Sequence, residues 1–245
     1  MLLDAPALAL VAGLGIIAAV VGGMGGFGTG IILTAALAPF IGVKAVIPVL
    51  AVAGAIINAG RFWFYREHVE RQALVLVLAC ALPFLVLGTW IYSVLDARVI
   101  GTVLGIAVLL SVPLRRALDR RRMRLGRSGL AVGSSVFGLA SGLTSGVGVI
   151  LISLLLGSGM AGPAVLATDA LVSIALDVCK AALFQRFSLL DEQTFVTGVV
   201  IGVATIPGSA LAAWLVTRMH AHLHVVFMEG LILIGGASLL WNSWR

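Results

Sequence analysis

The chain has 245 residues, of which 61% are hydrophobic and only 11% are charged, and its mean hydropathy is +1.17. This composition excludes a water-soluble domain and predicts a membrane protein. The formal net charge is +6, and much of it is concentrated in one arginine cluster instead of being spread along the chain.

Apolar segments of about 17 to 25 residues, the length that crosses the roughly 30 Å hydrocarbon core of a bilayer, recur along the whole chain. Each is expected to be a helix, because a lipid-facing backbone must form its hydrogen bonds within its own segment. The alternation typical of a membrane β-strand is missing. In chain order the predicted segments are residues 7–39 with a glycine-rich break after residue 21, then 46–64, 73–95, 99–114, 130–156, 164–184, 195–216 and 223–241.

Neither a cleaved leader nor a disulfide framework is expected. The first six residues contain Asp4 and no Lys or Arg, whereas an export signal would begin with a basic region. Cys80 and Cys179 both fall inside predicted helices. The predicted fold class is therefore an all-α polytopic membrane protein that keeps all of its apolar segments.

Two stretches about 120 residues apart look like copies of one another. Residues 25–30 read G-G-F-G-T-G and residues 141–148 read S-G-L-T-S-G-V-G, and each stretch breaks an apolar segment. A shift of 120 residues superposes Gly28 on Gly148. Duplicated units with an interrupted helix are how many secondary transporters build a substrate site. We therefore predict two homologous repeats of about four transmembrane helices each, joined by a linker: residues 1–113, 129–245 and 114–128, respectively.

A dense arginine cluster predicts the orientation of the chain. It holds seven of the sixteen basic residues, opposed only by Asp119, and consists of Arg115, Arg116, Arg120, Arg121, Arg122, Arg124 and Arg127. The positive-inside rule places such a loop in the cytoplasm. Contact with anionic lipid headgroups explains the cluster. No nucleic-acid partner is expected, because no stacking aromatic residues are interleaved.

The number of crossings depends on how the glycine-broken segments run. If each crosses once, the chain has eight crossings, parallel halves and both termini inside. If each crosses twice, the total is ten and the halves are inverted. The eight-crossing arrangement is favoured, because it places Arg66 and Arg186 together on the cytoplasmic face. The margin is small, since Glu67, Asp191 and Glu192 make those loops nearly neutral, and a re-entrant hairpin at each break is an equal alternative.

The glycine breaks are also candidate anion sites. Scattered glycines let helices approach closely, but four glycines within residues 25–30, each costing roughly 1 kcal/mol in a helix interior, should open the backbone. Freed N–H groups at the positive end of the following helix suit an anion. The candidate substrate contacts in the two breaks are Gly25, Gly26, Gly28, Thr29, Ser145, Gly146 and Gly148.

Further motifs in each half carry a resemblance to a known family. The first half contains A-V-I-P-V-L-A-V-A from Ala45 and F-Y-R-E-H-V from Phe64. The second contains A-V-L-A-T-D-A-L from Ala164 and F-Q-R-F-S-L-L-D from Phe184. Together with the glycine breaks, they resemble the two repeats of the sulfite exporter TauE/SafE family, also called the toluene sulfonate uptake permease family, over essentially the entire chain. The resemblance implies a bacterial inner-membrane carrier for small anions such as sulfite and organosulfonates.

The chain departs from the family pattern where substrate contact is expected. Pro48 and Val49 in the first half, and Thr168 and Asp169 in the second, replace a common Thr-Ser pair. Thr29 stands where family members often have Gly. Thr168 and Asp169 are therefore candidate substrate contacts, and an atypical substrate is expected.

Charged groups inside apolar helices are costly, which makes them candidate functional residues. Asp169 has no basic neighbour within a helical turn, whereas Asp177 and Lys180 are three residues apart and are expected to lie side by side as an ion pair. The matching region of the first half contains Asn58 and Arg61. Arg61 either binds a sulfonate through its planar guanidinium or extends to the membrane interface.

The predicted function is secondary transport of a small anion, with a proton or sodium ion as the co-transported partner. No nucleotide-binding loop and no cofactor are predicted, and the run of His220, His222 and His224 fits a pH-responsive loop better than a metal site. A membrane scaffold is the alternative function, and an intramembrane enzyme is a weaker one because no base is expected at membrane depth. The residues expected to couple transport to an ion gradient are Asp169, Asp177, Lys180 and Glu229.

Overall fold

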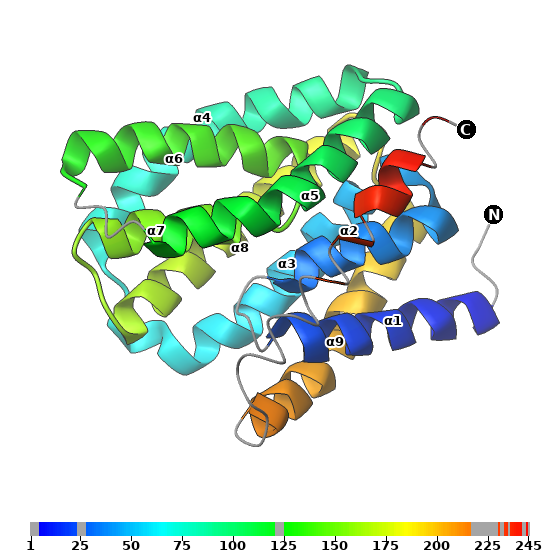
Figure 1. Cartoon of the computed structure of the whole chain (residues 1–245), viewed down its shortest axis with the longest axis horizontal. Helices are drawn as coiled ribbons and strands as arrows, with labels where there is room; N and C mark the ends of the chain where they lie inside the picture. Colours follow the sequence, from blue (N-terminus) through cyan, green and yellow to red (C-terminus); the bar gives the residue numbers. More distant parts are fainter. Residues whose placement is uncertain are drawn as a thin grey trace.

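The computed structural model describes residues 5–23, 28–120 and 125–216, together with residues 230, 233, 234, 236–241 and 244. Within this part of the chain the fold is almost entirely helical and contains no strand (Figure 1), so the all-α prediction is confirmed there. In chain order the elements are α1 (Ala5–Gly23), α2 (Gly28–Ile41), α3 (Val43–Tyr65), the 3₁₀ turn η1 (Arg66–His68), α4 (Arg71–Val94), α5 (Ala97–Arg120), α6 (Arg127–Leu143), α7 (Gly148–Gly157), α8 (Pro163–Arg186) and α9 (Glu192–Val216).

Two of the described helical segments, Val43–His68 and Arg71–Val94, are long and apolar enough to cross a bilayer, by length and composition alone. Each has an exposed tryptophan near its C-terminal end, Trp63 on α3 and Trp90 on α4. Such positions are typical of the aromatic belt at a membrane interface. Shorter apolar helical segments occur at Ala9–Val20, Thr29–Ile41, Ala97–Leu110 and Gly148–Gly157.

The second glycine-broken segment folds back on itself. Between α6 and α7, Gly146 adopts a φ of 79°, a left-handed conformation that glycine takes without strain. At the other end of the pair, the Leu125 N–H donates a hydrogen bond to the Gly157 carbonyl at 2.7 Å, which joins the start of α6 to the end of α7. The two helices therefore form an antiparallel hairpin. This segment does not cross once, as the favoured eight-crossing arrangement required.

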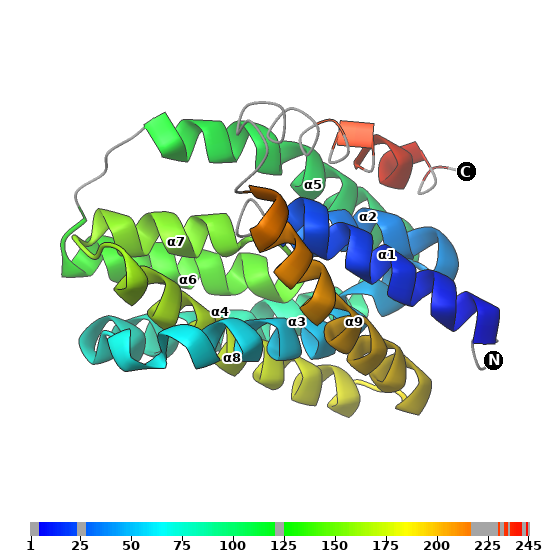
Figure 2. The ribbon, with the colours of Figure 1, turned by 90° about the horizontal axis from the view of Figure 1, so that it is seen from below.

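The helices on either side of the first glycine break also pair. α1 and α2 pack side by side and run in opposite directions (Figures 1 and 2). The residues between them, 24–27, lie outside the described residues. Each half of the chain therefore begins with two helices packed against each other.

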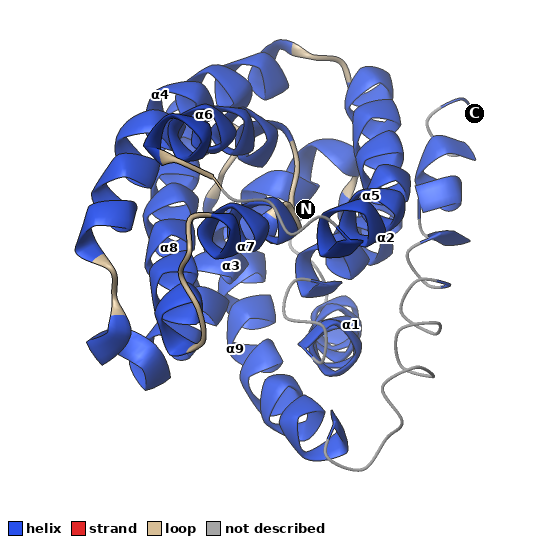
Figure 3. Cartoon of the chain, turned by 60° about the vertical axis from the view of Figure 1, so that its left-hand side comes forward, coloured by secondary structure: helices blue, strands red, loops and turns tan. Residues whose placement is uncertain are grey.

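α3 and α8 lie at the centre of the bundle and pack against each other (Figure 3). On one side α4 packs against α6 and α8, and on the other α9 packs against α1 and α3. The α4–α6 pair is in backbone contact: a Cβ atom at Gly138 would overlap the Ala81 carbonyl, and one at Gly142 would lie 2.6 Å from the Leu85 carbonyl oxygen. Small residues at such contacts let membrane helices pack closely.

The two central helices run antiparallel. Arg61 near the end of α3 pairs with Asp169 near the start of α8, whereas Asp177, further along α8, lies against the middle of α3. Arg66, which follows α3, and Arg186, which ends α8, therefore lie at opposite ends of this helix pair. The expectation that these two arginines lie at the same end of the bundle is therefore wrong.

Two clusters of buried apolar side chains hold these layers together. One joins α1, α2, α3 and α5, and the other joins α4, α6, α7 and the first half of α8. At one end of the bundle, the Arg127 side chain donates to the Gln72 side-chain oxygen at 3.5 Å. The start of α6, which follows the arginine-rich linker, thus lies at the same end as the start of α4.

Candidate functional site

A cavity of about 880 Å³ lies between the central helices α3 and α8 and the starts of α2 and α7. Nine residues that the sequence singles out line this cavity, although they come from both halves of the chain. They are Thr29, Asn58, Arg61, Ser145, Gly146, Gly148, Asp169, Asp177 and Lys180. The fold therefore brings together the two glycine breaks and the charged groups of the apolar helices.

Thr168, predicted as a substrate contact, is not among the residues that line the cavity. Its hydroxyl oxygen accepts a hydrogen bond from the Glu70 N–H at 3.0 Å, which ties the start of α8 to the η1–α4 corner. Thr168 therefore holds its neighbour Asp169 in place. Gly28 is the first residue of α2, and the remaining predicted site residues, Gly25, Gly26 and Glu229, lie outside the described residues.

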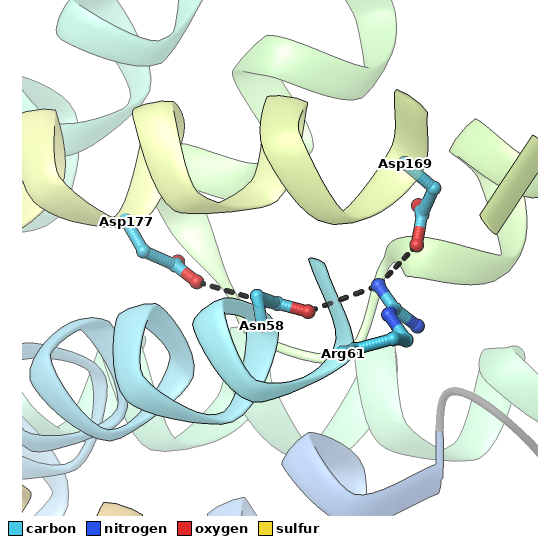
Figure 4. Close-up of polar contacts among 4 residues, drawn as sticks. All are labelled: Asn58, Arg61, Asp169 and Asp177. Carbon is cyan, nitrogen blue, oxygen red and sulfur yellow. Dashed lines mark hydrogen bonds and ion pairs between the residues drawn. The ribbon is translucent and has the colours of Figure 1, made fainter. Parts of the chain in front are cut away.

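A chain of polar contacts runs along the interface between α3 and α8. Arg61 forms an ion pair with Asp169 and also donates from Nη2 to the Asn58 Oδ1 atom at 2.9 Å. Asn58 Nδ2 in turn donates to Asp177 Oδ2 at 3.3 Å (Figure 4). Lys180 Nζ lies 3.1 Å from Asp177 Oδ1, so these two residues form the ion pair that their spacing indicated.

The four charged side chains in this chain of polar contacts are largely buried. Their side chains are 24% exposed for Arg61, 2% for Asp169, 13% for Asp177 and 5% for Lys180. Two cations and two carboxylates give a balanced set, which is the condition under which buried charges are tolerated. One atom stands out: Asp169 Oδ1 is buried and has no hydrogen-bond partner among the described residues.

Gly54 makes room for this arrangement, and it is not among the residues predicted from the sequence. A Cβ atom at this position would lie 2.5 Å from Asp177 Oδ2 and 3.1 Å from Asp177 Cγ. Gly54 precedes Asn58 by one helical turn, so both residues lie on the face of α3 that meets α8. A small residue one turn before a polar residue in an apolar helix is the signal that would have found it.

The two glycine breaks meet at the inner end of the cavity. A Cβ atom at Gly30 would lie 2.8 Å from Ser145 Oγ, and Ile31 lies directly against Gly146. α7 begins at this point with no side-chain cap on its first turn. The first N–H groups of α2 and α7, which have no acceptor within their helices, are thus concentrated beside the cavity with the positive ends of the two helix dipoles.

The cavity is closed towards one end of the bundle. On α3 its lining extends from Leu50 to Tyr65, the C-terminal part of the helix, and omits the first turns. At the opposite end Tyr92 and Phe184 pack edge to face with their ring centroids 5.4 Å apart, and both are fully buried. The cavity therefore lies on the same side of this aromatic pair as the end of α3.

No group of three or more His, Cys, Asp or Glu side chains that could hold a metal ion occurs among the residues that the structure describes. The histidine run at 220–224 lies outside these residues. The lining of the cavity offers instead a guanidinium, an ammonium, hydroxyls and residues at the N-terminal ends of α2 and α7, which are the kinds of groups that bind a small oxyanion.

The fold and the site together define a helical membrane protein with a balanced, charged cavity between two glycine-broken segments. The family model of the sulfite exporter TauE/SafE family matches residues 11–239, nearly the whole chain. The protein therefore belongs to the TauE/SafE family of membrane transporters, and the resemblance drawn from the motifs is confirmed. Comparisons with curated proteins and with solved structures gave no match.

Proposed function

We propose that this protein is a secondary carrier that moves a small anion of the sulfite or organosulfonate class across the bacterial inner membrane. The observation that carries the proposal is the cavity in which Arg61 meets the starts of α2 and α7. A planar guanidinium and the N-terminal ends of two helices match the oxygens of a sulfonate or sulfite group. The balanced charges of the cavity suit a ligand that arrives with its own compensating ion.

Inverted repeats are proposed as the architecture, with residues 1–113 and 129–245 as the units and 114–128 as the linker. The helix packing supports this proposal if α1, α3 and α4 of the first half correspond to α6, α8 and α9 of the second. α1 packs against α9 as α6 packs against α4, and α3 packs against α9 as α8 packs against α4. The antiparallel course of α3 and α8 is what an inverted pair requires. In this arrangement each glycine-broken segment enters the membrane and turns back as a pair of helices, and three longer helices of each half, an odd number, invert the second half relative to the first.

The inverted arrangement also suits the positive-inside rule. With the arginine-rich linker in the cytoplasm, the end of α3 and the start of α4 are cytoplasmic, with Arg66 and Arg71 there. Lys44, Arg98 and Arg186 are then external. Most of the basic residues thus stay inside, as the rule demands. The cavity, which extends along the end of α3, would open towards the cytoplasm, and alternating access would close it there and open it past Tyr92 and Phe184.

An ion gradient is proposed as the source of energy. Asp169 lines the cavity, and Asp177 and Lys180 lie next to it on α8. Carboxylates in such positions carry protons in many pumps and transporters. Glu229 remains a candidate of the same kind.

Ligand-dependent stability tests the proposal first. Protein purified in detergent is heated with sulfite, sulfate, thiosulfate, two-carbon sulfonates and small carboxylates, because a ligand that binds only the folded state stabilises it by about 2.7 kcal/mol at a concentration of 100 times Kd. We expect a selective rise of the unfolding temperature with one chemical group. A flat response with every anion at acidic and neutral pH would refute the carrier proposal and favour a membrane scaffold.

Flux into liposomes then tests the site. Arg61→Gln should lower the affinity for the anion by about 10- to 100-fold, the value of a hydrogen bond to a charged group. The matched control is Arg71→Gln, which removes the same charge from an exposed position at the start of α4. Equal flux in the two variants, both shown to be folded by size-exclusion chromatography, would place the anion elsewhere.

A further inference from the structure

Asp169 differs from the other carboxylate of the cavity in the use of its two oxygens. Asp177 has a partner on each oxygen, Lys180 on Oδ1 and Asn58 on Oδ2. Asp169 uses only Oδ2, which pairs with Arg61, while Oδ1 is buried without a hydrogen-bond partner among the described residues. A buried carboxylate oxygen with no donor is the place where a proton can be added without breaking any existing contact of that atom.

The charged groups around Asp169 leave no surplus positive charge for a ligand. From α3 it faces Arg61 and, further along the cavity wall, Tyr65; from its own helix come Asp177 and Lys180. The elements that complete the wall contribute only neutral polar groups among the described residues: Thr29, Ser141, Thr144, Ser145 and Thr205. With both carboxylates ionised, an anion that enters makes the cavity net negative in a region of low dielectric, which is strongly unfavourable.

Arg61 has the geometry to change partners without leaving the cavity. Its Nη2 atom is held by Asn58 Oδ1 at 2.9 Å, on the same helix and independent of Asp169. Its side chain is the most exposed of the four charged groups. Loss of the contact with Asp169 would therefore leave the guanidinium anchored next to the cavity and open to another anion.

We propose that the anion and Asp169 compete for Arg61, and that Asp169 takes up one proton from solution each time Arg61 turns to the anion. The ion pair between Arg61 and Asp169 breaks, the ion pair between Arg61 and the anion forms, and the proton binds the freed carboxylate. When the anion leaves, the proton leaves and the ion pair re-forms. A monovalent anion thus moves together with one proton and without net charge. This inference rests on the proposed anion carrier, and it adds the coupling ion and the stoichiometry.

The test measures protons and anions together. Ethanesulfonate is the probe, because it stays ionised at every pH used and so contributes no titration of its own. Its binding to detergent-purified protein is measured by calorimetry in two buffers that differ in ionisation enthalpy, from acidic to mildly alkaline pH. We expect uptake of one proton per anion and, at alkaline pH, an affinity that falls about tenfold per pH unit, because the two binding events are linked.

Two variants make the assignment to Asp169 specific. Asp169→Asn should bind ethanesulfonate with the same affinity at every pH and with no proton uptake, since Arg61 has lost its competitor. Glu192→Gln removes an exposed carboxylate at the start of α9 and should keep the pH dependence and proton uptake of the wild type. In liposomes, an imposed membrane potential without a pH gradient should drive no accumulation of the anion by the wild type.

The wild-type measurements decide the proposal even if Asp169→Asn does not fold. Binding with no proton uptake, or accumulation driven by membrane potential alone, would overturn the coupling scheme and leave the carrier function intact. A failure of every anion of the panel to bind at any pH would overturn the carrier function, and the coupling scheme with it.

Discussion

Substitution of Gly54 by alanine should destabilise the protein. The effect should arise from the chain of polar contacts between α3 and α8 (the polar chain) and not from the apolar core. The new Cβ would lie 2.5 Å from Asp177 Oδ2, well inside van der Waals contact, so the Asp177 side chain must move. We expect that movement to break its hydrogen bond with Asn58 at 3.3 Å and its ion pair with Lys180 at 3.1 Å, because both contacts depend on the position of the carboxylate. Lys180 is only 5% exposed, so it cannot turn to bulk solvent without a larger rearrangement of α8.

The expected magnitude follows from these contacts. Breaking a buried ion pair costs about 3 to 5 kcal/mol, and the gain in helix propensity from Gly to Ala offsets about 1 kcal/mol of this. A net loss of about 2 to 4 kcal/mol in the free energy of unfolding is expected, which lowers the unfolding temperature by about 4 to 16 °C for a chain of this size. Binding of the anion should also weaken, because Asn58, which holds Arg61 through Oδ1, loses the hydrogen bond with Asp177 that orients its own side chain.

The assay is unfolding of detergent-purified protein, followed by circular dichroism. Gly13→Ala is the matched control, since it makes the same change inside a helix, α1, where no atom lies within 4 Å of the added Cβ. We expect Gly13→Ala to equal or slightly exceed the stability of the wild type. If Gly54→Ala is as stable as Gly13→Ala, the polar chain does not depend on the space that Gly54 provides, and the reasoning is refuted.

Three further changes test other parts of the structure. Gly138→Ala should cost about 1 to 3 kcal/mol, because its Cβ would overlap the backbone of Ala81 and push α4 and α6 apart; unchanged thermal unfolding would contradict this close packing. Asp191 precedes α9, and the hydrogen bonds that its carboxylate accepts from the Thr194 side chain and from the Thr194 N–H at 2.8 Å lower the pKa of this carboxyl group below its ordinary value. This stabilisation, about 1 kcal/mol, should be complete at neutral pH and disappear as the pH falls through the lowered pKa, so Asp191→Ala and wild type should differ in unfolding temperature at pH 7 and converge in strong acid. Tyr92→Phe removes a buried hydroxyl that donates at 3.1 Å to a carbonyl at the start of α3 and should cost about 1 kcal/mol in the same unfolding assay.

The sequence was sufficient for the class of protein and for many of the polar residues that line the candidate cavity. Charged groups in apolar helices are expensive, so Asp169, Asp177 and Lys180 could be identified one by one without knowledge of their neighbours. The ion pair between Asp177 and Lys180 was predictable because it is local. The partner of Asp169 was not, since Arg61 is 108 residues away in the chain and only the packing of α3 against α8 brings the two together.

The sequence did not determine the orientation of α8 relative to α3. The loop after α3 contains Glu67 beside Arg66, and the loop after α8 contains Asp191 and Glu192 beside Arg186, so neither loop has a strong charge bias. The decisive feature is the chain reversal at the glycine break, where Gly146 takes a positive φ. Glycine allows that conformation but does not require it, so the reversal depends on the packing of α7 against α6.

The proposed inverted repeats account for the position of the chain of polar contacts between α3 and α8. Asn58 and Asp177 are 119 residues apart, close to the offset that superposes the glycine breaks, and they are hydrogen-bonded to each other. Residues at matching positions of two inverted units can touch only near the axis that relates the units. Arg61 and Lys180, also 119 residues apart in the sequence, then lie on opposite sides of that axis, one more exposed and one buried. In the proposed inverted arrangement, a single anion site at the axis is flanked by one cation from each half, and we expect an alternating-access carrier to use this arrangement to present the same site to both sides of the membrane.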